Sequence, residues 1–234
     1  MPKPRQTISV VTPAHPARIT SGMLERAHRS VYAQTLLPDA ICIAIDIDKQ
    51  GSAPTRQHAL MQARTDWVAF LDSDDAFLPR HLELLLKYAL DRQVDYVYSW
   101  FKVVQQLGNG TTRVLDDDPI FPMSHYLDPF DPENPIETTI TTLVRTELAQ
   151  QVGFVNLDRG HSENAGDDRY FTLECVKAGA RVGHLVRKTW LWTHHQLPGT
   201  SKPGNTSGMP DRGDDAPDAQ HLIAQAASTA RATP

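Results

Sequence analysis

Three aspartates lie close together at the end of an apolar segment, in the stretch FLDSDDAFLP of residues 70–79. Asp72 and Asp74 are separated only by Ser73, and Asp75 follows directly. Carboxylates at this spacing repel one another, so we expect a cation, water or backbone amides to offset the repulsion. Such a pair can hold a divalent cation and reach a ribose or a diphosphate. The alternative is a solvated turn in which Asp75 caps the next helix.

Two further acidic pairs offer related chemistry. Asp46 and Asp48 follow another apolar run and are either turn formers or, with Asp72, an acidic wall suited to a base edge or to ribose hydroxyls. Asp167 and Asp168 open a predicted helix. They either cap that helix or supply a general base that removes a proton from a hydroxyl.

Basic and imidazole side chains could complete such a site. His194 and His195 follow a predicted strand, and they are either a surface pair or, since imidazole is a common metal ligand, part of a metal site. Arg56 lies near the start of a predicted helix and is either a solvated surface charge or a contact to a diphosphate.

The elements that must position these residues alternate along the first 90 residues. Apolar runs cover residues 7–16, 40–48 and 66–72, and helical patterns cover residues 19–38, 54–64 and 79–90. This alternation predicts a parallel sheet with helices on both faces, in which every strand ends at the same edge. Ligands bind at that edge in open sheets, so the acidic clusters are predicted to lie on the functional edge.

The second half of the chain is less regular. We predict two strands in residues 95–115 around an Asn109-Gly110 turn, and a loop rich in proline and acid over residues 116–135. Helices are predicted over residues 141–153 and 166–179, each closed by a glycine, and a last strand over residues 180–195. Beyond Gln196 the chain has few apolar residues, which predicts a flexible tail with a weak helix over residues 218–228.

Composition limits the class of protein. The 234 residues, 40% of them hydrophobic, are enough for one large domain. A net charge of -5 makes nucleic acid an unlikely partner, because it leaves no broad basic surface. Cys42 and Cys175 show no metal-site or disulfide spacing and are predicted to be reduced core thiols. With no secretory apolar region and no run of about 20 apolar residues, a cytoplasmic protein is expected.

Several segments occur in the order typical of one family. ISVVTPAHP resembles its first strand, and GSAPTRQHALMQARTDWVAFLDSDDAFLPRHLELLL resembles its A-R-N-x-A helix and hydrophobic-L-D-x-D-D segment. TTLVRTELAQQVGF and GDDRYFTLECVKAGARV are similar to its acceptor-side segment. The chain thus resembles the family 2 glycosyltransferases over about residues 7–201. Their GT-A fold is a Rossmann-like three-layer α/β/α arrangement with a mainly parallel central sheet.

The resemblance also implies a domain organisation. A GT-A domain is expected over residues 1–195, with a nucleotide-binding half of about residues 1–104 and an acceptor-side half of about residues 105–195. Residues 196–234 would form the flexible tail. This tail could act as a lid over a bound donor.

The resemblance assigns roles to particular residues. The nucleotide-sugar site would be bordered by Thr12, Pro13 and Ala14, with Ser73 nearby; Asp46 would hold the base, Asp72 the ribose, and Arg56 would approach the diphosphate. Asp74, with His195 or His194, would hold a divalent metal, Mn²⁺ or Mg²⁺. Asp168 or Asp167 would be the catalytic base.

The implied function is metal-dependent transfer, with inversion, of one sugar from a nucleotide-diphospho-sugar to the hydroxyl of an unidentified acceptor. The chain lacks the Q-x-x-R-W pattern of processive synthases, which favours transfer of a single sugar. It departs from the family where Ile47 separates Asp46 from Asp48, where Gln57 replaces asparagine and where Asp167 replaces glutamate. A nucleotidyltransferase and a catalytically silent nucleotide-sugar-binding module are the alternatives.

Overall fold

The computed structural model describes residues 5–106, 112–115, 140–155, 167–196 and 203–204. The strands are β1 Ile8–Ala14, β2 Ala40–Ile45, β3 Trp67–Phe70, β4 Ala76–Phe77, β5 Tyr96–Gln106, β6 Thr112–Leu115, β7 Thr142–Arg145, β8 Val182–Gln196 and β9 Pro203–Gly204. The helices are α1 Pro16–Thr20, α2 Met23–Tyr32, α3 Ser52–Leu60, α4 His81–Arg92, α5 Thr146–Val152 and α6 Asp167–Lys177.

The strands form one sheet in the order β2-β1-β3-β7-β5-β8-β4, with β6 paired to β5 and β9 to β8. β2 and β3 each pair parallel to β1. β7 is antiparallel to both β3 and β5, so β5 runs in the direction of β3, and β8 is parallel to β5. The predicted, mainly parallel central sheet is confirmed.

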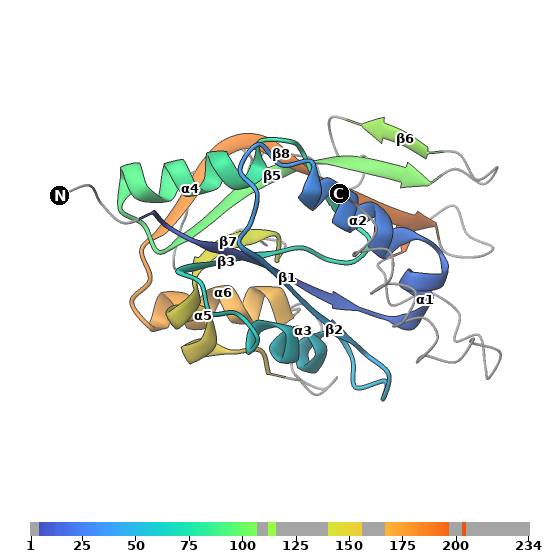
Figure 1. Ribbon diagram of the computed structural model, residues 1–234, viewed down its shortest axis with the longest axis horizontal. Coiled ribbons are helices and arrows are strands. Elements are labelled where there is room, and N and C mark those ends of the chain that lie inside the picture. The colour runs from blue at the N-terminus through green and yellow to red at the C-terminus, as the bar shows by residue number, and fades with distance from the viewer. Residues whose placement is uncertain (1–4, 107–111, 116–139, 156–166, 197–202, 205–234) are drawn as a thin grey trace.

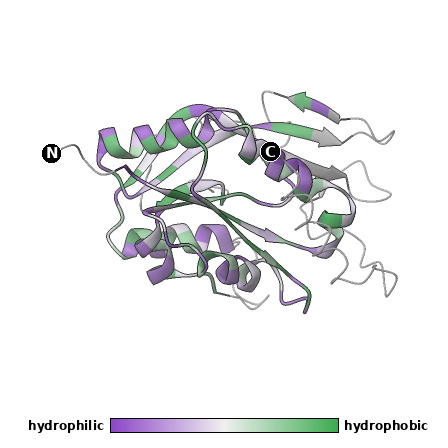
Figure 2. Ribbon diagram, in the orientation of Figure 1, coloured by the Kyte–Doolittle hydropathy of each residue, from purple (hydrophilic) through white to green (hydrophobic). Residues whose placement is uncertain are grey.

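Helices cover both faces of this sheet (Figure 1). α2 and α4 pack on one face through apolar side chains such as Val31, Leu82 and Leu85. On the other face, α3, α5 and α6 contribute Leu60, Ala149 and other buried residues to a second core. Figure 2 shows apolar colouring concentrated along the central strands and purple patches on the helices, as expected for helices that bury one face. The three-layer α/β/α prediction is confirmed.

Two short strands differ from the sequence-based prediction. Residues 141–153 were expected to form one helix, but Thr142–Arg145 is the antiparallel strand β7, and only Thr146–Val152 is helical. The β-branched residues Thr142 and Val144 fit the pleated surface between β3 and β5, which overrides the helical pattern. The two-residue strand β4, paired with β8, was not predicted.

The remaining predictions for the second half are partly testable. β5 and β6 are antiparallel as expected, and β8 confirms the predicted last strand. The Asn109-Gly110 turn, the loop of residues 116–135 and the predicted helix of residues 218–228 lie outside the described residues, as does the tail apart from β9.

Both cysteines are free and buried in the core that α3, α5 and α6 share with the sheet. Burial raises the pKa of Cys42 and raises that of Cys175 to about 12. The prediction of core thiols is therefore confirmed. Across the described part of the chain, none of the helices combines the length and the apolar character needed to cross a membrane.

Candidate active site

The carboxyl end of β1 lies between two acidic segments, as the alternation of strands and helices predicted. Ala14 is opposite Ile45 of β2, and the amide of Asp46 donates to the carbonyl of Ala14 at 2.8 Å. On the other side, the amide of Leu71 donates to the carbonyl of Val11, so Asp72 follows directly beside the end of β1. The register of three strands therefore brings Asp46 and Asp72 to one edge of the sheet.

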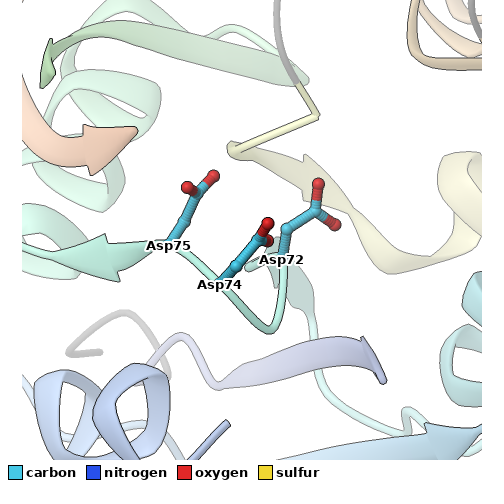
Figure 3. Close-up of side chains that lie close together, drawn as sticks. All are labelled: Asp72, Asp74 and Asp75. Atoms are coloured by element: carbon cyan, nitrogen blue, oxygen red, sulfur yellow. The ribbon is translucent and has the colours of Figure 1, made fainter. Parts of the chain in front are cut away.

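The loop between β3 and β4 carries three adjacent carboxylates, those of Asp72, Asp74 and Asp75 (Figure 3). One oxygen from each lies within 4.8 Å of the others. Asp74 and Asp75 are buried, which excludes the solvated turn. Burial raises the pKa of Asp72 and raises that of Asp75 well above the ordinary value, and neighbouring carboxylates add to both shifts.

Arginine side chains offset part of the repulsion expected within this loop. Nη2 of Arg18, in α1, lies 3.1 Å from Oδ2 of Asp74, and both side chains are buried. Nη2 of Arg26, in α2, donates to the backbone carbonyl of Asp74 and to Oγ1 of Thr193. Guanidinium groups, which the sequence analysis did not include among the groups expected to offset the repulsion, therefore occupy part of the site.

Asp75 does not cap the following helix. The N-terminal cap of α4 is Arg80, which makes no capping hydrogen bond through its side chain. Oδ1 of Asp75 instead accepts a hydrogen bond of 2.9 Å from the amide of Thr193 in β8. Asp75 thus ties the acidic loop to β8, two residues before His195.

Arg56 of α3 joins the acidic loop to the start of α6. Its guanidinium donates to Asp72 at 2.9 Å and to Asp167 at 2.6 Å, and lies 3.5 Å from Asp168. The side chain is 3% exposed, so the solvated surface charge is excluded. Desolvation opposes the charged form of Arg56, but the three carboxylates more than offset it and raise the pKa. Arg56 is therefore a fixed cation between two acidic segments.

Asp167 and Asp168 occupy the first turn of α6, as predicted, but their environments differ. Asp167 accepts hydrogen bonds from Arg56 and from Oγ of Ser52. Oδ1 of Asp168 has no hydrogen-bond partner among the described residues. Burial raises the pKa of Asp168 to about 7; Arg56 opposes this shift, and Asp167 and Asp72 reinforce it. Asp168 is therefore able to exchange a proton near neutral pH.

The segment after α5 packs against the guanidinium of Arg56. Its carbon lies 5.2 Å from the ring centre of Phe154, and Phe154 stacks on Phe171 of α6. The amide of Phe154 donates to Oε1 of Gln57 at 2.8 Å, next to Gly153, whose φ is 68°. Gln57, which replaces the family's asparagine, thus anchors the segment that supports Arg56.

The remaining predicted site residues lie at the ends of β1 and β2 and in β8. The carboxylate of Asp46 accepts hydrogen bonds from the amides of Gln50 and Gly51 and so closes the turn before α3. Thr12, Pro13 and Ala14 are buried at the end of β1. His194 and His195 lie in β8 directly after Thr193, and their side chains are outside the described residues.

Four residues of this site were not predicted from the sequence: Arg18, Arg26, Ser52 and Thr193. Arg18 and Asp74 are 56 positions apart, and no local pattern marks the arginine as their partner. The signal was only indirect, since Arg18 and Ser52 each lie a few residues after a predicted strand end.

The donor set fits a divalent cation. Three carboxylates with oxygens this close would have their mutual repulsion reduced by a hard cation, which prefers oxygen ligands. Burial is the main cause that raises the pKa of Asp72 and of Asp75, neighbouring carboxylates add to both shifts, and a bound cation would oppose them.

A separate hollow of about 550 Å³ lies at the opposite edge of the sheet, where β3 and β5 begin, and is lined by Asp66, Asp95 and Arg145 among others. Asp95 is paired with Arg181, and Asp66 accepts hydrogen bonds from Thr7. The hollow is remote from the acidic clusters, and we assign it no role.

Comparison with known proteins agrees with this architecture. The Staphylococcus aureus protein TarS, residues 1–349, superposes with a TM-score of 0.62 in its complex with UDP-GlcNAc and 0.60 in its complex with UDP. Sequence identity is 19% for the UDP-GlcNAc complex and 18% for the UDP complex. The superpositions cover 81% and 80% of this chain, but only 59% and 60% of TarS 1–349. The fold is that of the GT-A glycosyltransferases.

Sequence comparison gives two matches to glycosyltransferases. The family model described as glycosyl transferase family 2 matches residues 46–153. An uncharacterized glycosyltransferase of Methanocaldococcus jannaschii is 37% identical over 60 residues, which are 25% of this chain and 21% of the relative. These matches support the resemblance of the sequence to glycosyltransferase family 2.

Proposed function

We propose that this protein transfers one sugar, with inversion, from a nucleotide-diphospho-sugar to an acceptor hydroxyl, and that a divalent metal assists the reaction. The observation that carries the proposal is the junction of two acidic segments at the edge of the sheet where the strands end. Arg56 joins Asp72, beside the end of β1, to Asp168, at the start of α6. This junction would bring the proposed donor site and the proposed base together.

The donor would lie along the ends of β1, β2 and β3. Asp46 would face the base, and Asp72 and Ser73 the ribose, with Thr12, Pro13 and Ala14 along the side of the nucleotide. Arg56 is already paired with three carboxylates. Its main role in this proposal is therefore to position Asp72 and Asp168, and a contact to the diphosphate is secondary. The UDP-GlcNAc and UDP complexes of TarS support a nucleotide-sugar donor.

Asp74, with His195 or His194, would hold Mn²⁺ or Mg²⁺. A bound cation would supply charge neutralisation for the leaving diphosphate. The backbone supports this assignment, because the Asp75–Thr193 hydrogen bond keeps β8, and with it the two histidine positions, beside the acidic loop.

Asp168 is the proposed base. Its Oδ1 makes no hydrogen bond among the described residues, whereas Asp167 is held by Arg56 and Ser52. A carboxylate with a pKa of about 7 can accept the acceptor's hydroxyl proton at neutral pH while the oxygen attacks the anomeric carbon. Attack on the face opposite the departing diphosphate inverts that carbon.

The proposed function is tested with a panel of nucleotide sugars in the presence of Mn²⁺. We expect one donor to bind and to be slowly hydrolysed, with release of nucleotide diphosphate, and the anomer first formed, followed by NMR, should be inverted. Release of pyrophosphate from a nucleoside triphosphate would indicate a nucleotidyltransferase instead. Binding without any release would indicate a silent module.

The base assignment is tested with Asp168→Asn. The amide cannot accept the proton, so kcat should fall by about 10²- to 10⁴-fold while the dissociation constant of the donor stays within about twofold. Asp91→Asn is the matched control, because Asp91 is exposed on α4 and pairs there with Lys87. Unchanged turnover of Asp168→Asn would refute the assignment.

A further inference from the structure

Arg18 places a buried positive charge on the carboxylate that the proposed function gives to the metal. Its side chain is 6% exposed and that of Asp74 is 7% exposed, with 3.1 Å between Nη2 and Oδ2. A second nitrogen of the same guanidinium, Nη1, lies 3.0 Å from Sδ of Met23. The Arg18 guanidinium is thus held inside the site by a charged and an uncharged partner.

The local structure around Arg18 fixes this position. α1 is one short helix between β1 and α2, with Pro16 at its start and the His15 ring accepting a hydrogen bond from the amide of Ala17. Oγ of Ser21 donates to the carbonyl of Arg18 at 3.3 Å. Hydrogen bonds thus hold both ends of α1 and fix the backbone from which the Arg18 side chain reaches Asp74.

The charge balance of the site leaves room for one divalent cation. Among the described residues that contact one another here, five carboxylates face three guanidinium groups, those of Asp72, Asp74, Asp75, Asp167 and Asp168 against Arg18, Arg26 and Arg56. The carboxyl groups among these residues therefore outnumber the guanidinium groups by two. A divalent cation would add positive charge where carboxyl groups are in excess, but its contact to Asp74 would compete with Arg18.

We propose that Arg18 is a resident counter-ion of Asp74 that a divalent cation must displace, so that Arg18 sets the metal affinity of the site. This inference rests on the proposed function, in which Asp74 is a metal ligand. Without a bound cation, the Arg18–Asp74 pair avoids a buried, uncompensated carboxylate, which would be strongly unfavourable. The same pair weakens cation binding, because the cation has to break it.

The test measures Mn²⁺ binding to the nucleotide-free protein by calorimetry and by EPR of free Mn²⁺. Arg18→Gln should bind Mn²⁺ at least about fivefold more tightly than the wild type, the lower range of ordinary coupling between two sites. Its melting temperature in EDTA should be lower, and Mn²⁺ should raise it by more than in the wild type. Arg18→Lys, which keeps a positive charge, should stay close to the wild type.

Two controls separate the inference from the proposed function. Arg29→Gln makes the same change in net charge at an exposed pair with Glu25 and should leave Mn²⁺ affinity unchanged. Asp74→Asn should remove Mn²⁺ binding. If Asp74→Asn removes binding but Arg18→Gln binds no more tightly than the wild type, the counter-ion inference is overturned and the metal site stands. If Asp74→Asn binds as tightly as the wild type, the metal assignment itself fails.

A measurement on the wild type covers the case in which Arg18→Gln does not fold. The chain has five methionines, so methyl NMR of labelled methionine gives few signals, and Met23→Leu identifies that of Met23. Displacement of Arg18 by Mg²⁺ should shift the Met23 methyl signal, since the guanidinium contacts its sulfur. The signal should stay in place in Asp74→Asn. A Met23 signal unmoved at saturating Mg²⁺ in the wild type would also overturn the inference.

Discussion

Arginine and aspartate side chains carry most of the electrostatic organisation of this site. A guanidinium group presents several donors in a fixed plane, so Arg56 can bind Asp72 and Asp167 at once while remaining close to Asp168. Each carboxylate therefore has a different degree of compensation. Burial, opposed by Arg56 and reinforced by Asp167 and Asp72, raises the pKa of Asp168 to about 7.

The pKa of Asp168 predicts the pH dependence of turnover. Its value in the folded protein, about 7, lies above the ordinary value of 3.8. The base must be deprotonated, so kcat should rise about tenfold per pH unit below 7 and level off above it. The folded state keeps a proton that the unfolded chain has lost between about pH 4 and 7, so this group's contribution to stability falls as pH rises through that window. A kcat profile flat from pH 5.5 to 8.5 would contradict the assignment.

Replacement of Arg56 should destabilise the whole protein. Arg56→Gln leaves Asp72, Asp167 and Asp168 without their shared cation, and breaking a buried ion pair costs about 3–5 kcal/mol. Urea unfolding should show this loss in the free energy of unfolding. Arg29→Gln, at an exposed pair, should change it by less than about 1 kcal/mol. Equal effects of the two substitutions would mean that Arg56 is not the structural centre of the site.

At the level of elements, short connections between strands and helices position the reactive groups. The β3–β4 loop holds three carboxylates, β4 attaches that loop to β8, and α6 begins with the acidic pair. The segment from Gln57 to Phe154 supports the arginine that joins them. A shift in any of these connections should change the position of Asp168.

Gly153 offers a test of that support. Its φ of 68° with ψ of 175° is a conformation that essentially only glycine adopts, and an added Cβ would lie 3.2 Å from Oε1 of Gln57. Gly153→Ala should lower the free energy of unfolding by about 1–3 kcal/mol and reduce kcat by displacing Phe154. Gly22→Ala is the control, because φ is 74° but nothing lies within 4 Å, and it should cost less and leave kcat unchanged.

At the level of the whole molecule, charged residues are concentrated at one edge of the sheet, and an apolar core lies on each of its faces. The overall charge of -5 is small, whereas the site holds five carboxylates among the residues described. Binding of a cation or of a donor at this edge would connect β1, β3, α1 and α6, and would thus stabilise the folded chain.

Divalent metal should therefore raise thermal stability. A cation that binds only the folded state adds about 2.7 kcal/mol at 100 times its dissociation constant. Differential scanning fluorimetry with and without Mn²⁺ should show a higher melting temperature, and Asp74→Asn should abolish the increase. A wild-type protein whose melting temperature ignores Mn²⁺ would contradict the metal assignment.

The sequence predicted features that depend on neighbouring residues and missed those that depend on distant ones. The order of apolar runs predicted the strand ends that hold Asp46 and Asp72, and the acids opening α6 were predicted from their place in a helical pattern. β7 was missed because Arg145 leads directly into α5, with no glycine or proline to mark the change. Arg18 was missed because its partner follows two crossovers later.

Both cysteines lie in the interior, and this has a practical consequence for measuring movement in the molecule. A thiol reacts with maleimide dyes as the thiolate, and burial keeps Cys42 and Cys175 protonated at neutral pH. A cysteine introduced at an exposed position, such as Lys49, would then be the main site of labelling in the native chain. Fluorescence from that position could follow donor binding without removal of either native thiol.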